Sequence, residues 1–214
     1  MTRDEMIARY NHAIELINEK QQFRNGADEL EALAQETKNV TVVLGSMSAS
    51  NMMAKLDFET ENYAGSIHYA DLVIDWAIMF SNEEALMNEN KEQILNAYRL
   101  AQSLKGRAML HKDMNDSECV GPLEEAVDYG DVEALYWLGA FYTMNNCEPQ
   151  ENIELYKTGA VKAANYWEQY IEKCDKSEDP EKISMICGWL ASHYKEGLGV
   201  PKDMNKYQYY ARLS

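Results

Sequence analysis

Apolar residues recur along most of this chain at the three- to four-residue spacing of amphipathic helices. The first run opens at Thr2, whose side chain can form a capping box with Glu5. A second capping box, Ser81 with Glu84, is expected to open a long helix. The helices predicted in the first half of the chain are 2–25, 28–38, 40–58, 63–80 and 81–112.

The segment 40–58 carries mixed signals. Its beginning, Thr41-Val42-Val43-Leu44, has the β-branched composition of a strand, whereas Met47, Met52, Met53 and Leu56 recur at helical spacing. We assign it to a helix. Elsewhere Pro122 and Pro180 are each expected at the first position of a helix, with acidic residues in the first turn.

Two glycines near the end of the chain are expected to form the turn of a helical hairpin. Gly197 is expected to end one helix in the left-handed conformation, and Gly199 gives the turn a second permissive position. Val200 can return an apolar side chain between the helices, Pro201 prevents the first helix from restarting, and Asp203 is a candidate N-cap. The apolar positions that flank this turn are Leu190, Ala191 and Tyr194 before it and Tyr207, Tyr210 and Ala211 after it.

This pattern resembles the SEL-like repeat family, which is related to the tetratricopeptide repeats. The resemblance covers residues 186–214 and extends to 130–142, and it fades upstream. The matching residues of 130–142 are Asp131, Ala134, Leu135, Leu138, Gly139 and Tyr142. The resemblance implies a right-handed α-α superhelix of stacked helix hairpins that serves as a protein-binding scaffold, without family-wide catalytic residues.

Spacing along the chain agrees with stacked repeats. Leu104 and Leu138 lie 34 residues apart, the length of one helix pair, whereas Leu138 and Leu190 lie 52 apart. The longer step predicts an insertion within 147–177. We therefore expect an all-α solenoid forming one domain over 1–214, with degenerate helices over 1–80 and SEL-like repeats over 81–214.

Composition fits a helical protein with a substantial core. Of 214 residues, 46% are hydrophobic, and proline and glycine number only 4 and 11. Neither a leader peptide nor a membrane-spanning run is evident, so a cytoplasmic location is expected. The cysteines show no paired spacing and are interpreted as buried or half-buried thiols; they are Cys119, Cys147, Cys174 and Cys187.

The net charge of −16 is concentrated in one part of the chain. Residues 113–156 hold 11 acids and no Lys or Arg. Such a segment repels nucleic acid and anionic membrane, and it attracts a basic protein surface. Acidic runs are also ordinary solubilising surfaces, and this interpretation stays open. The candidate partner-binding residues are Glu124, Glu125, Asp128, Asp131, Glu133, Tyr136 and Trp137.

Patterns that carry catalysis are missing from the sequence. The four histidines are scattered without metal-ligand spacing: His12, His68, His111 and His193. Gly197-x-Gly199 lacks the strand and the third glycine of a dinucleotide loop, and Gly45-Ser46-x-Ser48 lacks the second glycine of a nucleophile elbow. We expect no enzymatic activity, cofactor or metal.

The leading functional hypothesis is a non-enzymatic protein–protein interaction scaffold or adaptor. An alternative is an acidic inhibitor or immunity-type protein that blocks a basic target, a class that includes nucleic-acid-binding proteins. A helical enzyme or small-molecule binder is the third possibility. A homodimer through the exposed end of the last hairpin is also compatible with the sequence.

Overall fold

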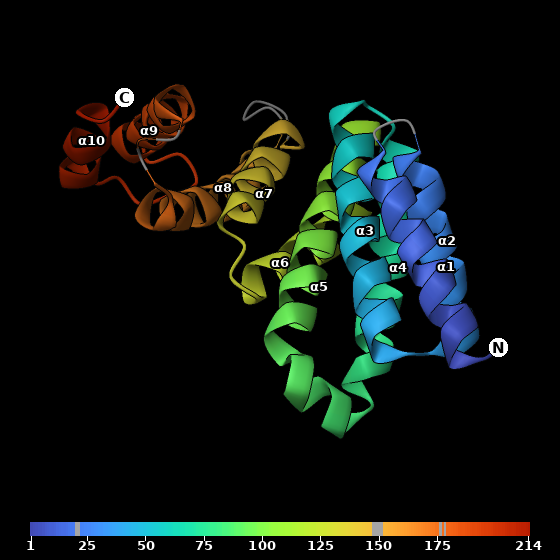
Figure 1. The fold of residues 1–214 in the computed structure, drawn as a ribbon. Coiled ribbons are helices and arrows are strands. Elements are labelled where there is room, and N and C mark those ends of the chain that lie inside the picture. Colours follow the sequence, from blue (N-terminus) through green and yellow to red (C-terminus); the bar gives the residue numbers. More distant parts are fainter. Residues whose placement is uncertain (20–21, 147–151, 176, 178) are drawn as a thin grey trace. The chain divides into compact units, whose positions relative to one another are not determined.

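The computed structural model describes residues 1–19, 22–146, 152–175, 177 and 179–214, and every regular element within these ranges is a helix (Figure 1). This confirms the predicted all-α class. The chain forms two compact units, Met1–Lys112 and Asp113–Ser214. A single repeat domain over the whole chain, with a division at residue 80, stays a prediction.

The first unit consists of five helices joined by short connections. Each helix packs against the next one along the chain, and the last also contacts the third. The helices are α1 (Arg3–Asn18), α2 (Phe23–Thr37), α3 (Val40–Glu59), α4 (Tyr63–Ser81) and α5 (Glu84–Lys112). The segment of mixed signals is therefore helical throughout, as assigned.

The first helix begins as predicted but ends earlier. Thr2 forms the capping box with Glu5, and α1 stops at Asn18, so the predicted end near residue 25 is wrong. Gly26 lies inside α2, where a Cβ would come within 2.6 Å of the Ala13 carbonyl oxygen. This glycine permits close packing of α2 on α1, and it does not end the first helix as predicted.

The predicted capping box at Ser81 is also wrong. Ser81 is the last residue of α4, and its hydroxyl donates a hydrogen bond to the Ile78 carbonyl oxygen at 2.7 Å. The following helix α5 starts at Glu84 and is interrupted at Asn90, whose backbone angles are not helical (φ −122°, ψ 15°).

A buried carboxylate ties three helices of this unit together. Asp57 on α3 is 2% exposed, and the Arg24 guanidinium of α2 donates to it at 2.5 Å. Its second oxygen lies so close to Gly65, in the first turn of α4, that a Cβ there would collide with it. The positive end of the α4 dipole thus faces a buried negative charge.

The second unit has one 3₁₀ turn and five α-helices among its described residues. They are η1 (Ser117–Cys119), α6 (Val120–Asp128), α7 (Val132–Met144), α8 (Ile153–Lys173), α9 (Pro180–Glu196) and α10 (Met204–Ala211). Consecutive α-helices pack against each other. Helix α8, the longest of these, occupies most of the segment where an insertion was expected.

The predicted glycine turn is confirmed. Gly197 caps α9 in the left-handed conformation at φ 73°, and Asp203 caps α10 by accepting hydrogen bonds from the backbone of Asn205 and Lys206. Gly199 has φ 77° and lies against α8, where a Cβ would collide with Ala160. The turn therefore joins α9 to α10 and also packs on the preceding helix.

Most predicted repeat positions are core positions. Leu138 and Leu190 are fully buried and Leu104 is 7% exposed. Gly139 is buried against the Trp167 ring, which leaves no room for a side chain. Further buried positions are Ala191, Tyr194, Val200 and Tyr210, while Tyr142 and Tyr207 are half-buried.

Two expectations in this unit are wrong. Ala211 is exposed, because the packed face of α10 ends at Tyr210. Pro122 is the third residue of α6 and not the first, because the preceding 3₁₀ turn runs directly into the helix. The start of α9 is confirmed, with Asp179 as its N-cap and Pro180 as its first residue.

Candidate functional site: an uncharged groove between α3 and α5

Helix α3 is apolar on more of its surface than the core of its unit covers. Val43, Met47 and Met53 are buried, as expected for the inner face. On the outer side Met52 is 50% exposed and Leu56 is 44% exposed. A helix that is apolar all round is normally buried on every side, so α3 presents surface that its own unit leaves open.

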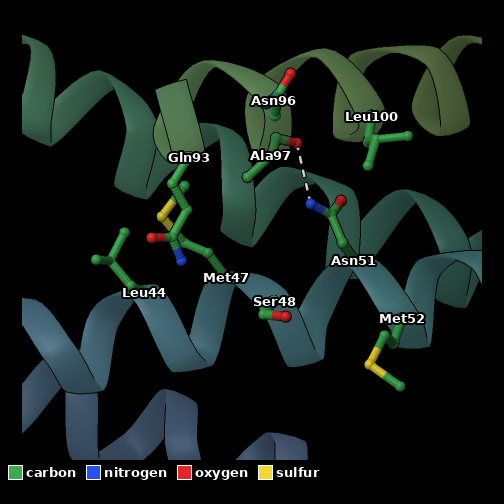
Figure 2. A pocket seen from close by; sticks show the side chains of 9 residues that line it. All are labelled: Leu44, Met47, Ser48, Asn51, Met52, Gln93, Asn96, Ala97 and Leu100. Atoms are coloured by element: carbon green, nitrogen blue, oxygen red, sulfur yellow. Dashed lines mark hydrogen bonds between the residues drawn. The ribbon is translucent and has the colours of Figure 1, made fainter. Parts of the chain in front are cut away.

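This open surface of α3 forms one wall of a groove, and α5 forms the other (Figure 2). The cavity has a volume of about 270 Å³. Leu100 of α5, which is 45% exposed, lines the same groove as Met52. The lining residues are Leu44, Met47, Ser48, Asn51 and Met52 from α3 and Gln93, Asn96, Ala97 and Leu100 from α5.

One amide holds the two walls together. The Asn51 side-chain nitrogen donates a hydrogen bond to the Ala97 carbonyl oxygen at 3.0 Å, drawn as the dashed line in Figure 2. The Asn51 side-chain oxygen is buried, and no described residue donates to it. Asn51 thus fixes the spacing of α3 and α5 and retains an unused hydrogen-bond acceptor.

A second hollow adjoins the groove along α3. It has a volume of about 550 Å³ and is lined by Phe23, Met52, Lys55, Leu56 and Glu59. Met52 belongs to both hollows, so the apolar surface continues from one to the other. Lys55 and Glu59 are one turn apart on α3, and the Lys55 Nζ lies 3.8 Å from the Glu59 Oε1. This ion pair supplies the charges of the second hollow.

The chemistry of the groove is that of a binding surface. None of its lining residues carries an ionisable side chain, so they offer apolar contact and neutral hydrogen bonds. Reasoning from motifs and charge runs did not predict this site. A signal for it exists, because residues 39–54 contain no Asp, Glu, Lys or Arg in a chain that is 26% charged.

The predicted acidic surface is divided between internal and exposed residues. Asp131 caps α7 by accepting from the Ala134 backbone, and Glu133 forms a 3.0 Å ion pair with Lys182 of α9. Glu124 accepts a hydrogen bond from the Tyr166 hydroxyl at 2.7 Å while remaining exposed. Glu125 and Asp128 are exposed on α6.

The two predicted aromatic anchors are half-buried, so neither is a fully exposed anchor. Tyr136 packs against the core of the second unit, and the Lys182 ammonium lies 4.6 Å from its ring centroid. The Trp137 ring meets Tyr136 edge-on at 5.0 Å between centroids. The structure thus brings Glu133, Lys182 and Tyr136 together as one contact between α7 and α9.

One histidine is enclosed in an aromatic cluster of the second unit. His193 is 7% exposed and stacks on Trp189 at 3.5 Å between ring centroids. Its Nδ1 lies 3.0 Å from the Trp189 carbonyl oxygen, an acceptor only, so Nδ1 carries the proton and Nε2 accepts from the Tyr156 hydroxyl at 2.8 Å. Burial lowers the pKa of His193, which keeps the ring neutral.

Within the described ranges, the remaining reactive side chains do not assemble into a centre. Among the described residues, no group of three or more His, Cys, Asp or Glu is placed to hold a metal ion. Cys119 and Cys187 are buried and Cys174 is half-buried, as predicted, whereas Cys147 lies outside the described residues. Over the same ranges, no helix has the length and apolar character needed to cross a membrane.

Comparison with known proteins found no matching protein-family model, curated protein or solved structure. The SEL-like resemblance therefore stays an expectation from the sequence.

Proposed function

We propose that the protein is a non-enzymatic protein-binding scaffold and that the groove between α3 and α5 is its principal docking surface. The observation that carries this proposal is the outer face of α3. Met52 and Leu56 are about half exposed beside hollows lined largely by apolar side chains, in a helix whose first fifteen residues bear no charge. Contiguous apolar surface of this kind is typical of protein interaction sites.

The helical organisation supports a repeat scaffold of the SEL-like kind. In the first unit α3 contacts both α4 and α5, the pattern of neighbouring hairpins in a solenoid. In the second unit Gly139 and Gly199 both permit contact with α8. We propose that these hairpins continue the α-α superhelix that the sequence resemblance implies and that the protein acts in the cytoplasm.

Affinity capture with matched surface variants tests the docking surface. Met52→Glu places a charge in the groove, and Ile78→Glu places the same charge on an equally exposed residue of α4 outside it, 52% against 50%. We expect a protein partner that wild type and Ile78→Glu retain and that Met52→Glu loses. A partner set that does not distinguish the two variants would overturn the proposal.

A second candidate function is inhibition of a basic protein through the exposed face of α6. The observation that favours it is that Glu124, Glu125 and Asp128 remain exposed beside Tyr129, which is 44% exposed. Carboxylates next to an accessible aromatic ring suit Lys- or Arg-rich surfaces.

Two combined variants separate this surface from the internal contacts. The triple change Glu124→Gln, Glu125→Gln and Asp128→Asn removes exposed charge, and we expect it to weaken a basic partner in a salt-dependent manner. The double change Asp131→Asn and Glu133→Gln instead removes a charged helix cap and an ion pair. Binding that is insensitive to both salt and the exposed triple variant would rule this function out.

A further inference from the structure

We infer that the occupant of the groove between α3 and α5 is a cationic amphipathic helix of a partner protein, inserted through an uncharged apolar face. The inference rests on the proposed function and specifies the chemistry of the partner. It follows from the groove's backbone, its length, its lining and the charge of the surrounding chain.

The backbone of the walls favours a helical occupant. Both walls are α-helical along the groove, so no strand edge is present there to pair with an extended peptide. The lining contributes polar side chains at four of its nine positions, Ser48, Asn51, Gln93 and Asn96, and these are too few to pair every backbone group of an extended segment. A segment that enters this groove must satisfy its own backbone hydrogen bonds, which a helix does.

The open surface is long enough for about three helical turns. The outer residues of α3 recur every four positions, at Leu44, Ser48, Met52 and Leu56. At 1.5 Å per residue this row spans roughly 18 Å, the length of a helix of about twelve residues. Such a helix presents apolar anchors at positions i, i+3 or i+4, and i+7.

The lining decides the character of the inserted face. Because the groove between α3 and α5 has no ionisable side chain, a charge inserted there would lose its hydration without gaining a counter-ion. Lys55 and Glu59 lie beyond Met52 and already face each other. The inserted face is therefore apolar and uncharged, and the flexible, half-exposed side chain of Met52 adapts to its shape.

The charge of the chain decides the outer face and argues against a second copy. Residues 1–112 hold 17 acids and 11 bases, and the whole chain has a net charge of −16. A second copy would bring like charges together. A helix whose outer face carries Lys and Arg would instead be attracted to this negatively charged protein. The partner helix thus combines an apolar inner face with a basic outer face.

Selection from a displayed library of random 16-residue peptides tests this inference on the intact protein. We expect the enriched peptides to share apolar residues at helical spacing with Lys or Arg between them and to become helical on binding by circular dichroism. Their affinity, measured by fluorescence anisotropy, should fall about tenfold or more for Met52→Glu and Ser48→Glu and stay within about twofold for Ile78→Glu, where tenfold corresponds to about 1.4 kcal/mol.

Several results would overturn the inference, and they separate it from the proposed function. Enriched peptides that are extended, proline-rich or acidic, yet lose binding with Met52→Glu, would leave the groove a protein-binding site with a different occupant. A wild-type dimer that Met52→Glu dissociates in sedimentation velocity would identify the occupant as a second copy. An absence of enrichment, or equal losses for Met52→Glu and Ile78→Glu, would overturn the helix inference as well as the groove.

Discussion

Single glycines have different roles in this chain that the sequence does not distinguish. Gly197 ends a helix in the left-handed conformation, as predicted, whereas Gly26 and Gly139 lie inside helices where neighbouring elements leave no space for a Cβ. The first role is local and can be predicted from the residues around it. The second depends on which helix lies opposite, so it becomes visible only in the folded structure.

Gly139→Ala tests the packing role. The added methyl group meets the Trp167 indole, so we expect a loss of about 1 to 3 kcal/mol in the free energy of unfolding. Urea denaturation measures it. Gly121→Ala in α6 is the control, because no neighbouring atom lies within 4 Å of the position that its methyl group would take, and we expect it to be neutral or stabilising by at most about 1 kcal/mol. Equal losses would contradict the packing role.

The turn glycines allow a second comparison. Gly197→Val places a β-branched side chain at φ 73°, and we expect this strain to cost about 1 to 2 kcal/mol of stability. Gly199→Val adds a collision with Ala160 of α8 to the same strain, so its melting temperature should fall further. If Gly197→Val lowered the melting temperature more than Gly199→Val, the turn would not pack on α8.

His193 predicts a pH dependence of stability. Burial lowers the pKa of His193 in the folded state from the ordinary value of 6.5. Above that pH the imidazole is neutral in both the folded and the unfolded state, so its full contribution to stability is present. As the pH falls below 6.5 the unfolded state takes up the proton first, and stability decreases. His111, whose pKa is also lowered by burial, adds a decrease of the same sign.

Urea denaturation at pH 7 and pH 5 measures this dependence. We expect wild type to lose stability between the two conditions, and His193→Gln to be less stable at pH 7 but to lose less on acidification. An unchanged difference between the two pH values in the variant would mean that His193 does not titrate as proposed.

At the scale of elements, helix type and order could be predicted from the sequence, and several boundaries could not. The mixed segment that forms α3 is helical because its apolar residues fill the core at helical spacing. The end of α1 was misplaced because Gly26 serves the packing of α2 on α1 and does not end a helix. The start of α5 was misplaced because Ser81 is the last residue of α4 and does not cap the next helix. The groove was missed because it depends on α5 lying beside α3.

The Arg24–Asp57 pair tests how the helices of the first unit are held together. Arg24→Gln leaves the Asp57 carboxylate buried without its cation, and we expect a loss of about 2 to 3 kcal/mol in stability, reduced because Arg24 is half exposed. Lys55→Gln is the control, because its pair with Glu59 is exposed and should be worth less than about 0.5 kcal/mol. Similar effects of the two variants would contradict the assigned role of Asp57.

At the scale of the whole molecule, net charge does not by itself locate a binding surface. The acidic character of the chain was evident from its composition, but five of the seven predicted binding residues make contacts within the second unit: Glu124, Asp131, Glu133, Tyr136 and Trp137. Asp131 caps its own helix α7, and Glu133 pairs with Lys182 of α9. Composition alone therefore overstates the acidic surface that a partner can reach.

Site-specific photo-crosslinking tests the central claim most directly. A photoreactive residue at Ser48, exposed in the lining of the groove, should capture a distinct protein partner, while the same residue at Ile78 on α4 should not. Both positions are exposed, so the comparison isolates the groove. Adducts at Ser48 that are no different from those at Ile78 would contradict the account.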